Sequence, residues 1–285
     1  MTETVAVAGA SGYLGRHVVA ALAAHGYRVR ALVRSQDAAE KPGRFGAPTL
    51  AGVVAEWQIV DYLLPRTLDG VFDGVDRVVS TLGVTRQKAD PWDVDFLGNL
   101  RLLEEAEASQ VHSFSYVNVI HSHTGTSTTM RSKHAFSQVL RRSAVAGHLV
   151  NPSGYFSDMT DFWLLARKGW GFVVGDGDAQ LNPIHGADLA EFIVSKLTEP
   201  AGEWDVGGPD VFTYRSLQQL MFELAGRPGR VVKLGPRATK TMIGLADHSS
   251  PQASNLARFF LEGLQIDAAG TPFGTHHLAD FLRDQ

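Results

Sequence analysis

A glycine-rich segment near the N-terminus has the residue types and spacing of a phosphate-binding turn. Three glycines, each three residues apart, stand in the segment GASGYLG, residues 9–15, between an apolar strand-like run and a helix-like stretch. Glycine lets the backbone approach a phosphate closely, and N–H groups at a helix start bind anions. In this context the segment predicts a pyrophosphate site of a dinucleotide rather than a plain structural turn. The residues predicted to form the site are Gly9, Ser11, Gly12, Tyr13, Leu14 and Gly15.

A basic residue at the end of the second predicted strand selects between two dinucleotides. NAD-binding proteins carry an acid there for the ribose 2′-hydroxyl, whereas this chain has Arg34 followed by Ser35. A guanidinium contributes roughly 1.5–3 kcal/mol of charge-assisted hydrogen bonding to a 2′-phosphate. We therefore expect NADP, as NADPH, in preference to NAD. The alternative is a solvated arginine at a strand end.

Alternating strands and helices must position these residues. Strands are predicted from apolar runs at 5–8, 27–33, 76–81, 114–120 and 148–150, and less clearly near 53–54. Helices are predicted from periodicity at 17–25, 94–109 and 130–146. Continuous apolar runs are typical of parallel strands covered on both faces. The order predicts an α/β fold with a Rossmann-type, doubly wound parallel sheet.

The pattern becomes less regular after residue 154. Helices are predicted near 158–167, 187–197, 214–225 and 252–264, with short strands at 203–206 and 230–234. We therefore expect an NAD(P)-binding Rossmann domain over residues 1–154. Residues 155–285 are expected to form a smaller substrate-covering region that returns some elements to the first domain.

Composition narrows the classes of partner. The 285 residues are 44% hydrophobic and 20% charged, as in ordinary globular proteins. A net charge of −4 without long single-sign runs argues against nucleic acid and membrane surfaces, and favours a small-molecule substrate. The absence of Cys excludes disulfides and thiolate sites, and fits a cytoplasmic protein. The N-terminal residues predict no secretory signal, and no apolar run reaches the ~18 residues of a spanning helix.

Six short motifs occur in the order found in a known protein family. They are GASGYLG at 9–15, Val33-Arg34, VDFLGN at 94–99, SYVNV at 115–119, NPSGYF at 151–156 and NPIHGADLA at 182–190. In these motifs the chain resembles the atypical short-chain dehydrogenase/reductase (SDR) superfamily and, within it, the NmrA-like NAD(P)-binding proteins. The resemblance covers nearly the whole chain.

The resemblance implies further cofactor contacts. Asp61 matches the acid that reaches the adenine in the family, and Lys133 matches the active-site lysine that holds the nicotinamide ribose. The remaining residues assigned to the cofactor on this basis are Thr81, Leu82 and Gly83 at the fourth strand, with Pro152 and Ser153 after the sixth.

The chain departs from the family at its catalytic positions. Thr129 replaces the usual tyrosine four residues before the lysine, and Asn118 stands about where the usual serine would be. A threonine hydroxyl is too weak an acid to replace a phenol whose pKa a lysine lowers. General acid assistance accelerates a reaction about 10²–10⁴-fold, whereas holding the hydride donor and acceptor together supplies an effective concentration of ~10⁵ M or more. The chain could therefore still be an enzyme without the tyrosine. The predicted catalytic set is therefore Lys133, Tyr155, Asn118 and Thr129.

Tyr155 is the candidate replacement proton donor. It follows the sixth predicted strand at the carboxyl edge of the sheet, where ligands bind in open α/β folds. A packing role is the equal alternative. His121 and His123 are weaker candidates, and water is another proton source.

The histidines do not predict a metal site. His121, His123, His185 and the pair at 276–277 lack a His-Glu-x-x-His pattern and carboxylates at ligand spacing, so we expect no metal. We expect His185 to fix a loop by hydrogen bonding, and Asp188 to cap a helix or form an ion pair.

Two functions from different classes follow. The first is an NADP-dependent oxidoreductase that transfers hydride to a small, rather apolar substrate with a carbonyl, conjugated alkene or similar electrophile. The alternative is a non-catalytic NADP(H)-sensing regulator of the NmrA type, which the missing serine and tyrosine favour. The substrate, the reaction direction and the choice between monomer and homodimer stay open.

Overall fold

The structure, a computed structural model, describes residues 2–84 and 88–285. Contacts between residues divide the chain into two compact units. The first unit comprises Met1–Asn118, Ser132–Asn151 and Leu189–Trp204, and the second comprises Val119–Arg131, Pro152–Asp188 and Asp205–Gln285. The boundary predicted after residue 154 lies near one of these divisions. Segments of the two units alternate along the chain, so neither unit is one continuous stretch of sequence.

The main sheet has eight strands in the spatial order β12-β9-β6-β5-β4-β1-β2-β3. They are β1 (Thr4–Ala8), β2 (Arg28–Val33), β3 (Glu56–Ile59), β4 (Arg77–Ser80), β5 (Ser113–Val117), β6 (Ala146–Pro152), β9 (Gly202–Gly207) and β12 (Thr271–Pro272). The pairs β1–β2, β1–β4, β2–β3, β4–β5, β5–β6 and β9–β12 are parallel. β1 and β5 are buried throughout, as strands covered on both faces are. The α/β fold with a Rossmann-type parallel sheet is confirmed.

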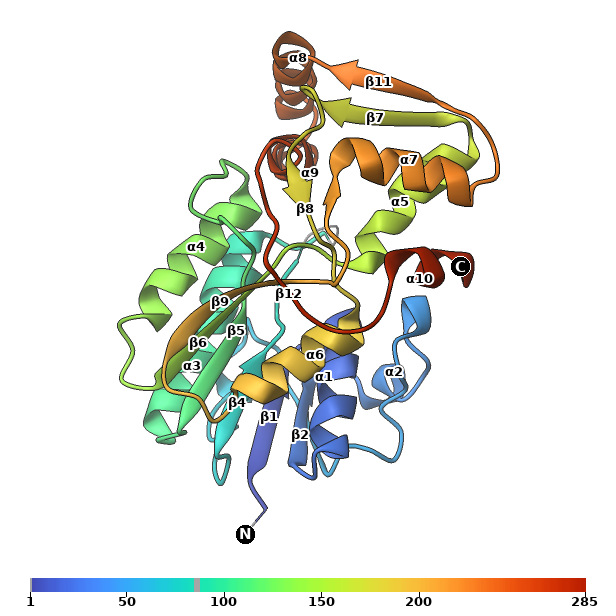
Figure 1. Ribbon diagram of the computed structural model, residues 1–285. Helices are drawn as coiled ribbons and strands as arrows, with labels where there is room; N and C mark the ends of the chain where they lie inside the picture. The colour runs from blue at the N-terminus through green and yellow to red at the C-terminus, as the bar shows by residue number, and fades with distance from the viewer. Residues whose placement is uncertain (1, 85–87) are drawn as a thin grey trace. The chain divides into compact units, whose positions relative to one another are not determined.

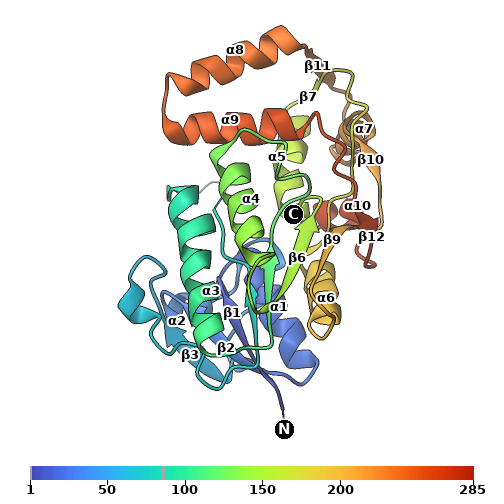
Figure 2. The same cartoon turned by 90° about the vertical axis from the view of Figure 1, so that its left-hand side faces the viewer.

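Helices cover both faces of this sheet. α1 (Tyr13–Ala24) and α6 (Gly186–Lys196) lie on one face, with α3 (Asn99–Ala108) and α4 (Thr128–Leu140) on the other (Figures 1 and 2). Leucines of α3 and aromatic residues of β5 and α4 form the core between them: Leu102, Leu103, Phe114, Tyr116 and Phe136. The short helix α2 (Gln36–Ala39) begins after Ser35, whose hydroxyl caps it by accepting from the Ala38 N–H.

The sheet register brings three strand ends together. Ala8 of β1 pairs with Leu32 of β2 on one side and with Ser80 of β4 on the other. Because the strands are parallel, the glycine turn after β1, Arg34 and Thr81 all leave the same edge of the sheet. This carboxyl edge is where ligands bind in open α/β folds.

The second unit combines helices with short strands. α5 (Phe156–Arg167) and α7 (Tyr214–Leu224) pack against β7 (Trp170–Val174), which pairs in parallel with β11 (Arg230–Leu234). The other elements are β8 (Gln180–Leu181), β10 (Phe212–Thr213), α8 (Pro236–Asp247), α9 (Pro251–Gly263) and α10 (Leu278–Arg283). Its core contains Phe156, Phe162, Leu217, Met221 and Leu282.

Several elements differ from their predictions. The strand predicted less clearly near 53–54 lies slightly later, as β3; it is an edge strand, which is half exposed and tolerates the polar Glu56 and Gln58. The helix predicted over 130–146 ends at Leu140, and Ala146 opens β6. The helix predicted over 94–109 begins as a π-helical segment, Trp92–Gly98, before α3. α8 was not predicted, and in the structure it buries only Thr239.

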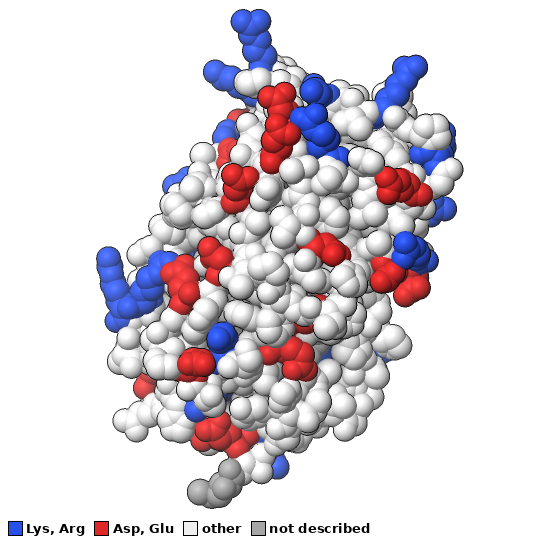
Figure 3. All heavy atoms as spheres, viewed as in Figure 1, with Lys and Arg blue, Asp and Glu red and all other residues white. Residues whose placement is uncertain are grey.

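Two surface findings bear on possible partners. Within residues 2–84 and 88–285, no helix is both long and apolar enough to cross a membrane. On the face drawn in Figure 3, basic and acidic side chains are interspersed and gather into no large patch of one sign.

A histidine pair in the second unit joins the C-terminal segment to the start of α6. The rings of His185 and His276 stack with centroids 4.2 Å apart, and His276 Nδ1 lies 2.7 Å from Asp188 Oδ1. Asp188 Oδ2 also accepts from the backbone N–H groups of Thr275 and His276. The Ala187 N–H donates to His185 Nδ1, so His185 does fix its own loop. Burial, and next the His276 ring, lowers the pKa of His185 to about 4, against the opposing effect of Asp188.

We expect His185 to make the stability pH-dependent. Its folded pKa lies below its unfolded value, so protonation favours the unfolded chain and stability falls as pH drops from about 6.5 toward 4. After allowance for partial exposure, urea unfolding should show a loss of about 1 kcal/mol between pH 7.5 and pH 5. His185→Gln should remove this loss, while the exposed control His112→Gln should keep it. An unchanged profile in His185→Gln would assign the loss to another group.

Candidate functional site

The glycine turn connects β1 directly to α1. Gly9 has φ +74°, a conformation that favours glycine, and Gly12 caps α1 without a side-chain hydrogen bond. The first turn of α1 contains no acidic residue, so nothing there opposes the positive end of the helix dipole. The backbone N–H groups of Tyr13, Leu14 and Gly15 fall in the first helical turn, where a helix leaves its donors without helical partners.

Two glycines of the turn permit contacts that a Cβ would prevent. A Cβ on Gly15 would stand 2.2 Å from the Gly9 carbonyl oxygen and 2.8 Å from Ala10 Cα. A Cβ on Gly9 would stand 3.0 Å from Thr81 Oγ1. The Thr81 hydroxyl donates to the Ala8 carbonyl at 3.0 Å, which joins the end of β4 to the turn. Thr81, with the buried Leu82 after it, is therefore brought beside the turn, and the contact of these residues with a cofactor stays a prediction.

A buried tyrosine that was not predicted joins the turn to the end of β2. Tyr62 accepts a hydrogen bond from the Gly9 N–H at 2.9 Å and donates one to the Leu32 carbonyl at 3.0 Å. Burial raises the pKa of Tyr62 to about 12, while the Gly9 N–H and the Arg34 charge oppose the rise. The phenol therefore stays neutral and holds both strand ends. Its position after an edge strand gives no signal in sequence.

The two charged residues assigned to the adenosine half have different surroundings. Arg34 is exposed, and no hydrogen bond or ion pair joins its guanidinium to another described residue. Asp61 is half-buried, and its Oδ1 accepts from the Leu63 N–H at 2.9 Å, so it shapes the turn after β3. The contact of Asp61 with an adenine stays a prediction.

Arg16 is a second structural residue that the sequence did not reveal. Its side chain is buried, and its guanidinium donates to the Ser11 carbonyl inside the turn. It also donates to four carbonyls beyond Arg34, those of Ala38, Ala39, Lys41 and Pro48. Arg16 thereby fixes the glycine turn and the segment after β2 to one another. Desolvation lowers its pKa.

Lys133 of α4 forms a buried ion pair. Its Nζ lies 2.9 Å from Asp95 Oδ1, and it donates to the Val117 carbonyl at 3.3 Å and to the Tyr116 hydroxyl at 3.4 Å. Asp95 belongs to the π-helical segment and is fully buried, and it also accepts from the Val84 N–H. Burial raises the pKa of Asp95, against the opposing effects of Lys133 and Val84.

Gly83 lies against this ion pair. A Cβ there would stand 2.8 Å from Asp95 Oδ1 and 3.0 Å from Lys133 Nζ. Lys133, Gly83 and the residues of β4 are thus brought together. Asp95 belongs to the motif VDFLGN at 94–99, but the sequence predicted no role for it in holding Lys133.

Two of the other three predicted catalytic residues have side chains that bond to protein partners. Asn118 is buried in the first unit, where its Nδ2 donates to Asn151 Oδ1 at 2.9 Å. Thr129 is fully buried in the second unit, where its Oγ1 accepts from Asn255 Nδ2 and its N–H donates to Asn255 Oδ1. Tyr155 is half-buried in the second unit and caps α5.

Pro152, the last residue of β6, and Ser153 after it belong to the second unit. The Pro152 carbonyl accepts from the Ile120 N–H, and the Ser153 N–H donates to the Val206 carbonyl at 2.9 Å. The Ser153 hydroxyl accepts from the Asn182 N–H at 2.9 Å. Ser153 also lines a cavity. Its assignment to the cofactor stays a prediction.

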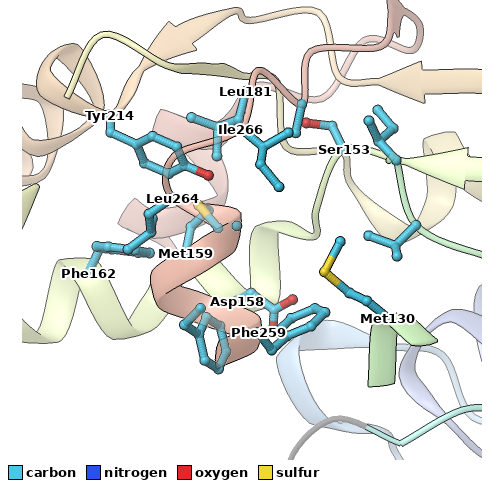
Figure 4. A pocket seen from close by; sticks show the side chains of 15 residues that line it. Met130, Ser153, Asp158, Met159, Phe162, Leu181, Tyr214, Phe259, Leu264 and Ile266 are labelled. Carbon is cyan, nitrogen blue, oxygen red and sulfur yellow. The ribbon is translucent and has the colours of Figure 1, made fainter. Parts of the chain in front are cut away.

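The cavity lies wholly within the second unit and is mostly apolar (Figure 4). Met159 and Phe162 come from α5, Phe259 and Leu264 from α9 and the residue after it, and Ile266 from the following segment. The side-chain oxygens on the lining belong to Ser153, Asp158 and Tyr214. The space open to the centres of water molecules is about 100 Å³, several times the ~10–15 Å³ that one water needs. An apolar cavity with few polar groups is suited to a small organic molecule.

Breaking the Asp95–Lys133 pair should destabilise the protein. Asp95→Asn keeps an acceptor for the Val84 N–H but leaves the Lys133 ammonium without its counter-charge, so we expect a loss of about 3 kcal/mol in urea unfolding. Asp93→Asn, an exposed change in the same segment, is the control and should cost less than about 0.5 kcal/mol. In the double variant Asp95→Asn/Lys133→Met the loss should be smaller than the sum of the single losses. Additive losses would show that the two side chains do not interact.

Comparison with known proteins places this geometry in a family. The model of a family described as NAD(P)H-binding matches residues 9–200. A divinyl chlorophyllide a 8-vinyl-reductase of Zea mays is 27% identical over 298 aligned positions, which cover 98% of this chain and 71% of the relative. A 4-hydroxy-2-methyl-3-oxo-4-farnesyl-3,4-dihydroquinoline-1-oxide ketoreductase of Stigmatella aurantiaca is 52% identical over 117 residues, 39% of this chain and 32% of the relative.

A solved structure shares the fold over the full length. The NADPH-dependent quinone oxidoreductase of Escherichia coli, complexed with NADPH, superposes with a TM-score of 0.71 at 18% identity and covers 98% of this chain and 99% of that one. The family match extends over more than half of the chain. The chain belongs to the NAD(P)H-binding family, which confirms its resemblance to the NmrA-like, atypical short-chain dehydrogenases/reductases.

Proposed function

We propose that this protein is an NADP-dependent reductase that transfers hydride to a small, largely apolar organic substrate with a carbonyl or conjugated electrophilic group. The apolar cavity of the second unit carries the proposal. Its lining residues Val119 and Ile120 follow β5 within three positions, and Ser153 directly follows β6. Along the chain, these lining residues therefore come just after the carboxyl ends of two sheet strands. Substrates of open α/β enzymes bind at such ends.

The relatives support this class of substrate. They include a 4-hydroxy-2-methyl-3-oxo-4-farnesyl-3,4-dihydroquinoline-1-oxide ketoreductase and, among solved structures, an NADPH-dependent quinone oxidoreductase. The Zea mays relative is a reductase of a vinyl group. A mostly apolar lining that includes three aromatic rings from Phe162, Phe259 and Phe260 suits ring systems of this kind.

The residues of the first unit fit a nicotinamide dinucleotide. The glycine turn lets α1 begin close to the end of β1, where the N–H groups of its first turn would bind the pyrophosphate. Arg34 supplies an exposed guanidinium for a 2′-phosphate, and Lys133 would hold the nicotinamide ribose. The reduced nicotinamide, when bound, supplies the hydride. Asp95 keeps the Lys133 ammonium in place, and Tyr155 or water provides the proton.

One observation favours the alternative of an NADP(H)-sensing regulator. Asn118 and Thr129 stand near the positions of the family's catalytic hydroxyls, and both side chains already bond to other protein groups. A regulator would bind oxidised and reduced cofactor with clearly different affinities and would reduce no substrate. The cytoplasmic location and the homodimer stay predictions under either function.

Arg34 should determine cofactor preference. Arg34→Ala should weaken NADPH binding about tenfold or more, because a charge-assisted contact with the 2′-phosphate is lost, and should leave NADH binding within about twofold. Calorimetric titration measures both affinities. Arg66→Ala, which removes an exposed arginine elsewhere in the first unit, is the control and should change neither. Equal losses for the two cofactors would contradict a 2′-phosphate contact.

Turnover tests the reaction class. We expect purified protein to oxidise NADPH in the presence of one or more members of a panel of quinones, cyclic ketones and enones, followed by the absorbance of NADPH. Lys133→Ala should reduce kcat/KM at least about 10²-fold, since positioning of the nicotinamide is lost. Tight NADPH binding without turnover of any panel member would favour the regulator.

A further inference from the structure

Tyr214, which no sequence motif singled out, places a phenol inside the apolar cavity. The residue is 7% exposed, and Figure 4 shows its ring projecting into the cavity with the hydroxyl directed toward the side where Met159 and Leu264 lie. No hydrogen bond joins this hydroxyl to another residue among 2–84 and 88–285. The hydroxyl therefore faces the cavity with its donor available, and a ligand's acceptor that reaches it there gains a hydrogen bond.

The backbone holds Tyr214 in this position firmly. It is the first residue of α7, after Thr213, whose side chain forms a capping box with Ser216. The Tyr214 N–H donates to the Ala179 carbonyl at 3.1 Å, and the Arg215 N–H donates to the Gly177 carbonyl at 3.0 Å. The ring belongs to the core of the second unit. The phenol is therefore preorganised, and little side-chain entropy is lost when it binds a ligand.

The chemistry of the hydroxyl defines what it recognises. Burial raises the pKa of Tyr214, so the phenol stays protonated at neutral pH and can donate a hydrogen bond. The rest of the lining offers mainly apolar contacts; its other side-chain oxygens belong to Ser153, which accepts from the Asn182 N–H, and to Asp158.

We infer that the Tyr214 hydroxyl is a specificity-determining group that donates a hydrogen bond to an oxygen of the substrate within this cavity. The inference rests on the proposed function, since it takes the cavity as the substrate site. It narrows the substrate class to uncharged apolar rings with a carbonyl or similar oxygen, and it disfavours the corresponding hydrocarbons.

Two probes of matched shape test the inference without turnover. 2-Methyl-1,4-naphthoquinone carries two carbonyl oxygens, and 2-methylnaphthalene has the same ring system without them. The protein has no Cys, so the quinone cannot add to a thiol. Equilibrium dialysis of the full chain, in the presence of NADP⁺ so that no reduction occurs, measures both affinities.

Tyr214→Phe should weaken binding of the quinone about five- to tenfold, the usual contribution of one neutral hydrogen bond. It should leave the affinity for the hydrocarbon unchanged. Tyr27→Phe, a loss of the same hydroxyl from the first unit, should change neither. Ala268→Leu narrows the cavity and should weaken the binding of both probes alike, which would show that both bind in the cavity. A thermal unfolding curve that matches the curve of the unchanged protein establishes that Tyr214→Phe is folded.

The failures of the two proposals are distinguishable. If Tyr214→Phe affects quinone and hydrocarbon equally, or affects neither, the Tyr214 inference is overturned even if the protein reduces quinones. If the oxygen-dependent loss appears but no panel member is reduced, the cavity and Tyr214 assignments stand and the reductase proposal fails.

Discussion

The close approach of α1 to the end of β1 is the constraint on which the first unit depends. Only hydrogen at the Gly15 Cα lets the helix start beside the Gly9 carbonyl, since a Cβ would stand 2.2 Å from that oxygen. The same turn is tied to β4 by Thr81, to β2 by Tyr62 and to the following segment by Arg16. These neutral and cationic groups fix the geometry and leave the helix N-terminus available to an anion.

The first half of the fold follows from local pattern, whereas the second does not. Buried parallel strands such as β1 and β5 are continuous apolar runs, and the glycine turn has its own spacing, so both are visible in sequence. β3 is a half-exposed edge strand without a continuous apolar run, and α8, which was not predicted, buries only Thr239. The residues that hold the site, Arg16, Tyr62 and Asp95, act through contacts between segments distant along the chain. Such contacts leave no local signature.

The residues predicted to be catalytic show the same limit. Lys133 was found through the resemblance, but its partner Asp95 emerges only when the π-helical segment packs beneath α4. The Thr129 hydroxyl, a candidate by its spacing, is bound by Asn255, which lies 126 residues further along the chain. Tyr214 has no motif at all, and its significance comes from the cavity that its hydroxyl enters.

The alternation of the two units along the chain restricts how this protein can be cut or assembled. The chain passes from one unit to the other after residues 118, 131, 151, 188 and 204. A fragment that stops after residue 154 lacks Leu189–Trp204, and with it the buried Leu189, Ile193 and Leu197. Neither unit is a contiguous module that recombination could transfer whole, or that a ribosome could complete before the other is begun. Both units must therefore be inherited and synthesised together, since the first is complete only at residue 204, after the second has begun at residue 119.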